Sequence, residues 1–454
     1  MEYVIQPKVV QVKESYDVAV IGGGPAGVSA AIAAARTGAS TVLIEKRAFL
    51  GGNVTASYVE TCNWYIGKED FEISGIYAEL EQKYRDQFGS SDDIRQNAPH
   101  RFSSEYLKIF LDETMQREGV TLKLHAFVND VIKENNEIKC VIIQSKNGPV
   151  AIEAKRFIDA TGDGDVAYSA GASYKQGRDL DGRCQPGTVN FRLSGVDSKL
   201  LSQDYDHLKD ISKKFHEDYR AGKTGLKCYR QDLPFGRMTP GGQITYVNYS
   251  CSYGIDPTDV DDLTKGEVEC RSYILDMVRY MKENYEGMEH IELSSIAPEI
   301  GFRDSRRIDG LYELTEDDIE QDRKFDDIIA VYPRFYDMLT PDEQKLQAGD
   351  GGIEGKGYDG HILVMIEKGR HFGIPYRCLL PVGLDNLLTS GRCISANHVA
   401  ESSIRGIYAC ALTGQAAGTA AALSAKQGIL PKELDVKLLQ ETLKANGMDL
   451  LSYA

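Results

Sequence analysis

The segment from residue 17 to residue 46 constrains the fold of this chain most. It reads DVAVIGGGPAGVSAAIAAARTGASTVLIEK, in which two apolar runs flank a glycine-rich turn and an alanine-rich stretch. Short apolar, β-branched runs are typical of buried parallel strands, and alanine is the strongest helix former. We therefore predict a strand at 17–21, a helix at 28–36 that stops near Gly38, and a second strand at 41–44.

Three glycines in this segment, Gly22, Gly24 and Gly27, have the spacing of a dinucleotide-binding turn. The first permits the tight turn, the second allows backbone to approach a pyrophosphate, and the third allows the helix to pack on the strand. Glu45 lies 18 residues beyond Gly27, where a carboxylate accepts from ribose hydroxyls and repels a 2′-phosphate. The pattern predicts a dinucleotide other than NADP; the alternative is a Rossmann-like turn without a ligand. The same segment adds three predicted contacts, Pro25, Ala26 and Lys46.

The charge balance and the cysteines argue against several other classes of protein. Lysine and arginine number 52 against 68 acidic residues, a net charge of −16, which disfavours a nucleic-acid surface. No run reaches the ~20 apolar residues of a membrane helix, and the first residues do not read as a signal peptide. The nine cysteines form no C-x-x-C pair. We therefore expect a reduced, cytoplasmic protein without a metal site.

The middle of the N-terminal half supplies further strands of the predicted sheet. Strand-like runs at 120–128 and 138–145 are separated by a turn sequence, and another run at 157–160 leads into a glycine-rich turn at 161–165. Ligands of open α/β sheets bind at the carboxyl ends of the strands. We therefore expect this turn to face the nucleotide.

A late segment repeats the same arrangement near the other end of the chain. The run 386–389 leads into Gly391 and then into an alanine- and glycine-rich helix predicted at 404–423. A simple NAD domain is contiguous, whereas a fold assembled from both ends suits a longer ligand, which favours FAD. The predicted cofactor contacts outside the first unit are Gly51, Gly52, Asn53, Phe127, Val128, Ala160, Thr161, Gly162, Asp165, Gly391 and Arg392.

The sequence resembles the glutathione-reductase-type FAD-binding superfamily. Within it, the chain is similar to the FAD-dependent oxidoreductase family that is grouped with fumarate reductase flavoproteins and thiazole-synthase-like proteins. The resemblance covers nearly the entire chain. It is carried by the Gly-x-Gly-x-x-Gly turn, the Gly51-Gly52 doublet, DATGDGD at 159–165, GFRDSRRIDGLYELT at 301–315 and IPYRCLLPVGLDNLLTSGRCIS at 374–395.

This resemblance implies an α/β fold with a Rossmann-like FAD-binding domain and an inserted α+β substrate domain. The FAD-binding domain would take residues 1–175 and 372–454, and the substrate domain residues 176–371. Within the latter we predict strands at 188–193 and 243–249. A helix is predicted there at 265–285, and the acidic segment 314–328 is predicted to be a solvated helix face or turn.

The late strand departs from the pattern of many relatives. They end this strand in an aspartate that holds the ribityl chain, whereas this sequence has Arg392, Cys393 and Ser395. Ser395 and Asn397 are the predicted substitutes for that contact. Arg405 is predicted to touch the flavin from the same segment.

The segment GFRDSRRIDG supplies the candidates for anion binding. Arg303 and Arg306 could share one face of a short helix and clamp a carboxylate, because a guanidinium binds such a group with two hydrogen bonds. The alternative, given equal weight, is that the arginines form salt bridges with Asp304, Asp309 and Glu313.

Two histidines and a tyrosine are the candidates for proton transfer. His398 is favoured because it follows the late strand, and His371 and Tyr376 are further candidates. Histidine titrates near neutrality and suits proton exchange beside hydride transfer, although a structural role is the more common one.

The predicted function is that of an FAD-dependent oxidoreductase. Hydride would pass between flavin N5 and a small polar metabolite, anionic if the arginines bind it, with an unidentified electron acceptor or donor. The alternatives are a nucleotide-binding scaffold without redox turnover and an NAD-dependent dehydrogenase. The expected partners are the small-molecule substrate and the electron carrier, without nucleic acid or a membrane span. The sequence leaves open whether the chain forms a homo-oligomer.

Overall fold

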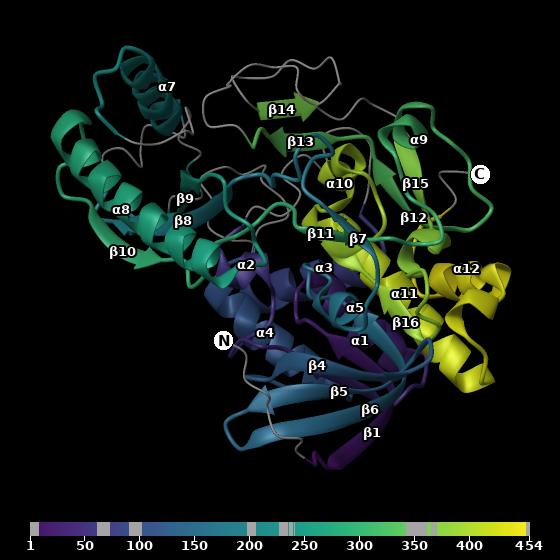
Figure 1. The fold of residues 1–454 in the computed structure, drawn as a ribbon. Coiled ribbons are helices and arrows are strands. Elements are labelled where there is room, and N and C mark those ends of the chain that lie inside the picture. Colours follow the sequence, from purple (N-terminus) through teal and green to yellow (C-terminus); the bar gives the residue numbers. More distant parts are fainter. Residues whose placement is uncertain are drawn as a thin grey trace, which may run out of the picture.

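The computed structural model describes residues 9–60, 73–89, 102–197, 206–226, 235, 239, 241–341, 361–364 and 370–450. Its centre is a seven-stranded sheet in the order β3-β2-β1-β6-β5-β4, to which β16 adds by pairing with β6 (Figure 1). The strands are β1 (Val12–Ile21), β2 (Thr41–Ile44), β3 (Thr121–Lys123), β4 (Phe127–Glu134), β5 (Glu137–Ser145), β6 (Gly148–Asp159) and β16 (Leu387–Thr389).

The long strand β6 joins two kinds of pairing in this sheet. Its first half pairs antiparallel with β5, and its last residues pair parallel with β16, while β1 runs parallel along its other edge. Strands β1, β2, β3 and β16 thus run in the same direction as the end of β6. Their carboxyl ends lie at one edge, which is where an open α/β sheet binds its ligand. The Rossmann-like α/β fold predicted from the sequence is confirmed.

Helix α11 (Ile407–Gln427) lies directly against helix α1 (Pro25–Arg36), although the two come from opposite ends of the chain (Figure 1). A Cβ added to Gly414 would lie 2.1 Å from the carbonyl oxygen of Ala26, and one added to Gly418 would lie 2.1 Å from that of Ala30. The two backbones therefore touch without side chains between them. This close packing fixes the amino-terminal end of α1 relative to the late segment.

One sequence prediction in the sheet is wrong. The run 120–128 is not a single strand, because β3 ends at Lys123 and β4 begins at Phe127. His125 between them has a left-handed backbone with φ 53°. Its N–H donates to the carbonyl oxygen of Arg47 at 3.0 Å, which turns the chain toward the residues after β2.

A second sheet, in the order β10-β8-β9, has its own hydrophobic core and is covered by the long helix α8 (Figure 1). Strands β8 (Gly187–Ser194) and β9 (Ile244–Ser252) match the predicted runs, and β10 is Glu292–Ile296. Helix α8 (Val260–Asn284) begins five residues before its predicted start, because the Asp259 carboxylate accepts from the N–H groups of Asp261 and Asp262.

The remaining elements belong to neither of these two sheets. Three two-stranded sheets pair β7 (Tyr174–Gln176) with β11 (Arg306–Ile308), β12 (Ile328–Pro333) with β15 (His371–Pro375), and β13 (Tyr336–Leu339) with β14 (His361–Val364). The helices are α2 (Asn53–Ala56), α3 (Gly75–Phe88), α4 (Ser104–Arg117), α5 (Asp165–Ser169), α7 (Asp206–Arg220), α9 (Glu316–Glu320), α10 (His398–Ile404) and α12 (Val436–Ala445).

Two further expectations for this region need correction. Arg306 begins strand β11, so Arg303 and Arg306 do not share a helical face. In the acidic segment, helix α9 is capped by Thr315, and its Asp318 is buried with its carboxylate turned back to that cap. The segment is therefore only partly a solvated turn.

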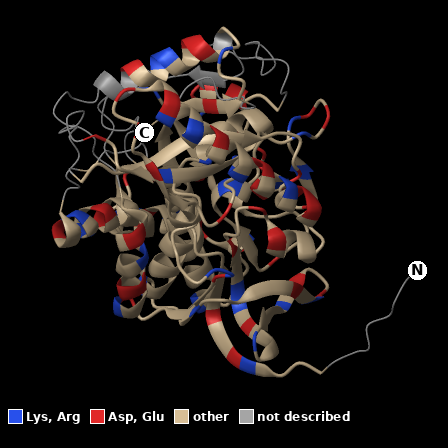
Figure 2. Cartoon of the chain, turned by 90° about the vertical axis from the view of Figure 1, so that its left-hand side faces the viewer, with Lys and Arg blue, Asp and Glu red and all other residues tan. Residues whose placement is uncertain are grey.

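No helix in the described parts of the chain is long and apolar enough to cross a membrane. Acidic and basic positions are interspersed on the face shown in Figure 2.

Candidate cofactor and active site

One large cavity of about 600 Å³ follows the carboxyl edge of the main sheet and reaches the start of α8. Its volume lies within the range of roughly 300–1,000 Å³ that is typical of ligand sites. Its walls come from seven separate parts of the chain. They comprise residues 22–26, 45–47, 52–53, Phe127, 160–163, Pro257, Leu263, Glu267, Glu299, Ile300, Phe302, Arg303, 390–392, Arg405, Ile407 and Cys410.

Helix α1 presents its amino-terminal end to this cavity. Gly24 is the N-cap, and no side chain caps the helix there. The first N–H groups of a helix lack partners within the helix and carry a partial positive charge, so they suit a phosphate. A Cβ on Gly52 would lie 2.9 Å from the Cα of Gly24, which shows that the glycine doublet crosses the turn at backbone distance. Pro25, Ala26 and Asn53 line the same end.

Gly27 has the packing role that its position in the pattern predicts, and it does not line the cavity. A Cβ on Gly27 would lie 1.7 Å from the carbonyl oxygen of Gly22, and Gly22 itself has φ 103°. Gly51 also lies behind the cavity wall, where a Cβ would meet the Thr55 side chain at 2.5 Å. Gly27 and Gly51 therefore shape the turn from behind, whereas Gly22, Gly24 and Gly52 line the cavity.

The Glu45 carboxylate lies at the end of β2 and is 3% exposed. One oxygen accepts from the N–H of Gly23 at 2.6 Å, and the other accepts from the N–H of Arg47 at 2.9 Å. The second oxygen also accepts from Nη1 of Arg47 at 3.4 Å, whereas the oxygen bound by Gly23 keeps a lone pair for a ligand hydroxyl. This position, with Lys46 beside it on the cavity wall, fits a ribose.

A small hollow of about 30 Å³ opens beside Glu45 and continues toward Phe127 and Val128. Thr161 and Asp165 form its other wall. Burial raises the pKa of Asp165 to about 6, and the charges of Asp163 and Asp159 act in the same direction. A flat ring placed here would meet Phe127 and an acid that holds its proton more strongly than usual.

Arg306 lies at this end of the site, where it pairs with an acid of the chain itself. Its Nη1 is 2.9 Å from a carboxylate oxygen of Asp165, and its guanidinium lies 4.1 Å from the centre of the Tyr168 ring. Among the acids that the sequence suggested as partners, Glu313 pairs with Lys175 at 2.7 Å and Asp304 pairs with His398 at 2.7 Å. For Arg306, the observed ion pair is therefore with Asp165 and not with an acid of its own segment.

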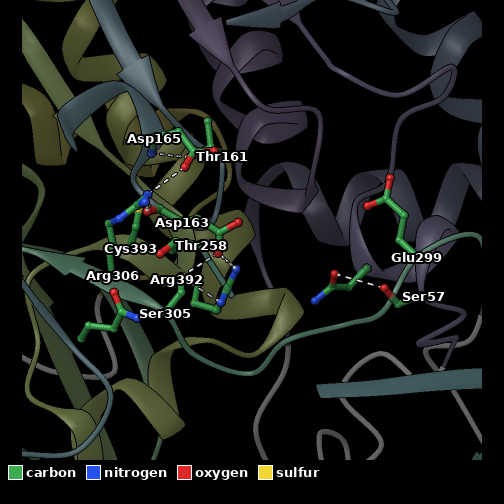
Figure 3. A network of polar contacts seen from close by, with 12 residues as sticks. Ser57, Thr161, Asp163, Asp165, Thr258, Glu299, Ser305, Arg306, Arg392 and Cys393 are labelled. Carbon is green, nitrogen blue, oxygen red and sulfur yellow. Dashed lines mark hydrogen bonds and ion pairs between the residues drawn. The ribbon is translucent and has the colours of Figure 1, made fainter. Parts of the chain in front are cut away.

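Arg392 anchors a polar network across the middle of the cavity (Figure 3). Its Nη2 is 2.5 Å from Asp163, and its Nη1 is 3.3 Å from the hydroxyl of Ser305, which also donates to Asp163 at 2.6 Å. Burial acts to lower the pKa of Arg392, but the charges of Asp163 and Glu401 outweigh it and raise the pKa. Asp163 was missed as a site residue, although it lies within the motif DATGDGD.

Two other arginines reach the far end of the cavity. Nη1 of Arg303 donates to the carbonyl oxygen of Pro186 and to the Thr188 hydroxyl, each at 2.9 Å. Arg405 donates to the carbonyl oxygen of Asp337. Arg303, Arg392 and Arg405 thus face one space, although they were predicted for different roles.

Several predicted residues lie outside the cavity lining. The Asn397 amide oxygen accepts from the N–H of Ala400 at 2.9 Å and so caps α10, and Ser395 is buried beside it. The Tyr376 hydroxyl donates to the carbonyl oxygen of Pro431 at 3.0 Å, and burial raises the pKa of Tyr376. His371 lies on β15, where burial lowers its pKa.

His398 also lies outside the lining, but it is next to residues that form it. The imidazole is 6% exposed, and its Nε2 is 2.7 Å from Oδ2 of Asp304, the residue that follows Arg303. Sequence reasoning missed this pairing because 94 residues separate the two side chains. It also missed the wall contributed by α8 and residues 299–302, for which no motif gives a signal.

A family model described as FAD dependent oxidoreductase matches residues 17–443. The mitochondrial dihydrolipoyl dehydrogenase of Schizosaccharomyces pombe is 28% identical over 168 residues, which cover 32% of each chain. The tRNA uridine 5-carboxymethylaminomethyl modification enzyme MnmG of Lactococcus lactis is 28% identical over 177 residues, covering 35% of this chain and 28% of that protein. The chain thus spans about a third of the length of the curated relatives it matches.

Among solved structures, the match with a geranylgeranyl bacteriochlorophyll reductase-like protein of Thermoplasma acidophilum has a TM-score of 0.44 at 14% identity. That match covers 95% of this chain and 83% of the other.

Proposed function

Because the chain belongs to the FAD-dependent oxidoreductase family, we propose that its cavity holds FAD along the sheet edge and admits a small anionic substrate beside the flavin. FAD is the cofactor of this family, and it supplies the acceptor or donor for a hydride when bound. The observation that carries the proposal is the convergence of three features on one cavity. These are an uncapped helix end, a glycine pair crossing at backbone distance, and a buried carboxylate.

Different residues of this chain would bind different parts of FAD. The α1 amino terminus and Gly52 would hold the pyrophosphate, and Glu45 would accept from the ribose that carries the adenine. Phe127 and Val128 would border the adenine. Gly391 and Arg392 would lie beside the ribityl chain. The guanidinium of Arg392 would there donate hydrogen bonds, in place of the aspartate of many relatives, which accepts them.

Two arginines on the cavity wall, Arg303 and Arg405, support an anionic substrate. The chain carries a net charge of −16, so attraction of an anion must come from local charge. Arg303 and Arg405 supply that charge where the cavity meets α8 and residues 299–302. A carboxylate bound there would place the adjoining carbon toward the flavin, and oxidation or reduction of that carbon would move a hydride between it and FAD.

We expect Arg303→Gln to raise the KM for a carboxylate substrate about 10- to 100-fold, because one charge-assisted contact contributes about 1.5–3 kcal/mol. The measurement is anaerobic bleaching of the bound flavin against panels of carboxylates, polyols and amines. Arg303→Lys keeps the charge without the two-pronged contact and should give an intermediate KM. Equal response of wild type and Arg303→Gln to every carboxylate, or bleaching by polyols or amines alone, would exclude the anion-binding role.

A further inference from the structure

Three buried side chains, Asp304, His398 and Glu401, come together beside the cavity. A carboxylate oxygen of each acid and a ring nitrogen of the histidine all lie within 4.8 Å of one another. His398 and Glu401 are three residues apart on α10, so they share one face of the helix. The two acidic side chains are fully buried, and that of His398 is 7% exposed.

The partners of Asp304 define which nitrogen of His398 carries hydrogen. Burial acts to raise the pKa of Asp304, but the hydrogen bond with His398, the N–H of Gln185 and the charge of Arg392 act together against it, so the pKa is lowered. The other Asp304 oxygen accepts from the N–H of Gln185 at 2.8 Å. Asp304 is therefore a carboxylate that accepts the hydrogen on Nε2. With its hydrogen on Nε2, the imidazole of His398 has its free lone pair on Nδ1, which is then the atom that can accept a proton.

Glu401 is in a different state. Its Oε2 lies 3.5 Å from Nη1 of Arg307, and its Oε1 has no hydrogen-bond partner among the described residues. Burial raises the pKa of Glu401 to about 8, and the charge of Asp304 acts in the same direction against the charges of Arg307, Arg392 and Arg405. Glu401 is therefore a neutral acid near pH 7.

The surroundings favour a proton over a metal ion at this cluster. Arg307 is 1% exposed and is held by the carbonyl oxygens of Ala396 and Gly177 at 3.0 and 2.8 Å. Its guanidinium cannot move away, and Arg392 and Arg405 add two more positive charges that act on Glu401. The guanidiniums repel a divalent cation more strongly than a single proton, and burial, the largest effect on Glu401, favours its neutral form.

We propose that Asp304, His398 and Glu401 form a proton-holding cluster that serves the cavity. The inference rests on the proposed function. When a substrate is oxidised, bound FAD would supply the acceptor for the hydride, which is one hydrogen with two electrons. His398 would hold at Nδ1 the second hydrogen, which leaves the substrate as a proton. Asp304 and Glu401 are positioning residues. Asp304 fixes the tautomer of His398, and Glu401, when neutral, limits the negative charge of the cluster. Arg303 and Ser305, on either side of Asp304, tie the cluster to the cavity wall and to Asp163.

The neutral state of Glu401 can be tested by stability without any substrate. The raised pKa means that, between the ordinary value of about 4.3 and about 8, the folded chain binds more protons than the unfolded chain. The free energy of unfolding contributed by Glu401 therefore falls as pH rises through that window. Gln cannot ionise, so Glu401→Gln lacks this loss. The melting temperature of Glu401→Gln minus that of wild type should rise by at least about 2 °C between about pH 5 and pH 8, then level off.

Glu60→Gln is the matched control, because Glu60 is a buried acid whose carboxylate is 2.7 Å from Arg192 outside the cluster. The melting temperature of Glu60→Gln minus that of wild type should not show the pH-dependent rise expected for Glu401→Gln. If the melting temperature of Glu401→Gln minus that of wild type stayed constant or fell as pH rises, the proposal would be overturned, because Glu401 would then be ionised. A stoichiometric divalent metal that is lost from Glu401→Gln would overturn it as well.

If Glu401→Gln fails to fold, infrared spectra of wild type with ¹³C-labelled glutamate give the same information. A protonated carboxyl band near neutral pH that disappears above about pH 9 supports the proposal, and its absence contradicts it. Both readouts are independent of FAD content. A protein that lacks flavin but shows the pH-dependent rise would refute the proposed function while leaving the proton-holding cluster standing.

Discussion

Gly24→Ala should weaken FAD binding about 100-fold while the free energy of unfolding of the protein without cofactor stays unchanged. A Cβ at this position would meet only the Cα of Gly52 within 4 Å, at an ordinary contact distance of 3.8 Å. The N-cap backbone has φ −74°, which any residue adopts. The protein itself therefore has room for the methyl group, and the pyrophosphate proposed to lie there does not. Overpacking of this kind costs about 1–3 kcal/mol.

The measurement is titration of cofactor-free protein with FAD, followed by urea unfolding of the same samples. Gly241→Ala is the matched control, since its nearest atom would be 3.9 Å away and it lies outside the cavity. Gly27→Ala is expected to disturb the fold itself, because its Cβ would lie 1.7 Å from a carbonyl oxygen. Wild-type affinity in Gly24→Ala would mean that no part of the cofactor approaches this turn.

Asp304→Asn is expected to lower the rate of flavin reduction by substrate at least about 100-fold, with FAD content retained. An amide that donates to Nε2 would favour the tautomer with hydrogen on Nδ1, so Nδ1 would no longer accept a proton. The rate is measured by rapid mixing with whichever carboxylate bleaches the wild-type flavin. Asp304→Glu retains a carboxylate and should restore part of the rate.

The pH profile separates this positioning role from a merely structural one. Wild type and Asp304→Glu should share the shape of their profiles, whereas Asp304→Asn should lose the limb that reports the base. A small decrease in rate with an unchanged profile would show that Asp304 only supports the loop before β11.

The nucleotide fold could be predicted well because its signals are local. The first βαβ unit carries apolar runs, glycines and an acid within 30 residues, and β2 matches its predicted bounds. Helix α1 starts three residues earlier than predicted because Pro25 suits the first helical turn. The break at His125 was missed because a non-glycine residue in the left-handed region gives no composition signal.

The far end of the site could be predicted only in part, because it depends on contacts between distant segments. Arg303 and Arg405 come from different motifs, and only the tertiary fold shows that they face one cavity. The roles of Arg306 and Asp304 depend on partners in α5 and α10. The sequence left open whether Arg306 binds an anionic ligand or pairs with an acid nearby in the chain. Its ion pair in the structure is with Asp165, 141 residues away, which no local pattern indicates.

The most direct test of the central claim is the visible absorption spectrum of the purified protein, repeated on the supernatant after acid precipitation. We expect flavin bands near ~450 nm, with FAD identified by mass spectrometry in the supernatant. Absence of these bands after purification and after incubation with FAD would contradict the claim, because the cavity along the sheet edge would then not be a flavin site.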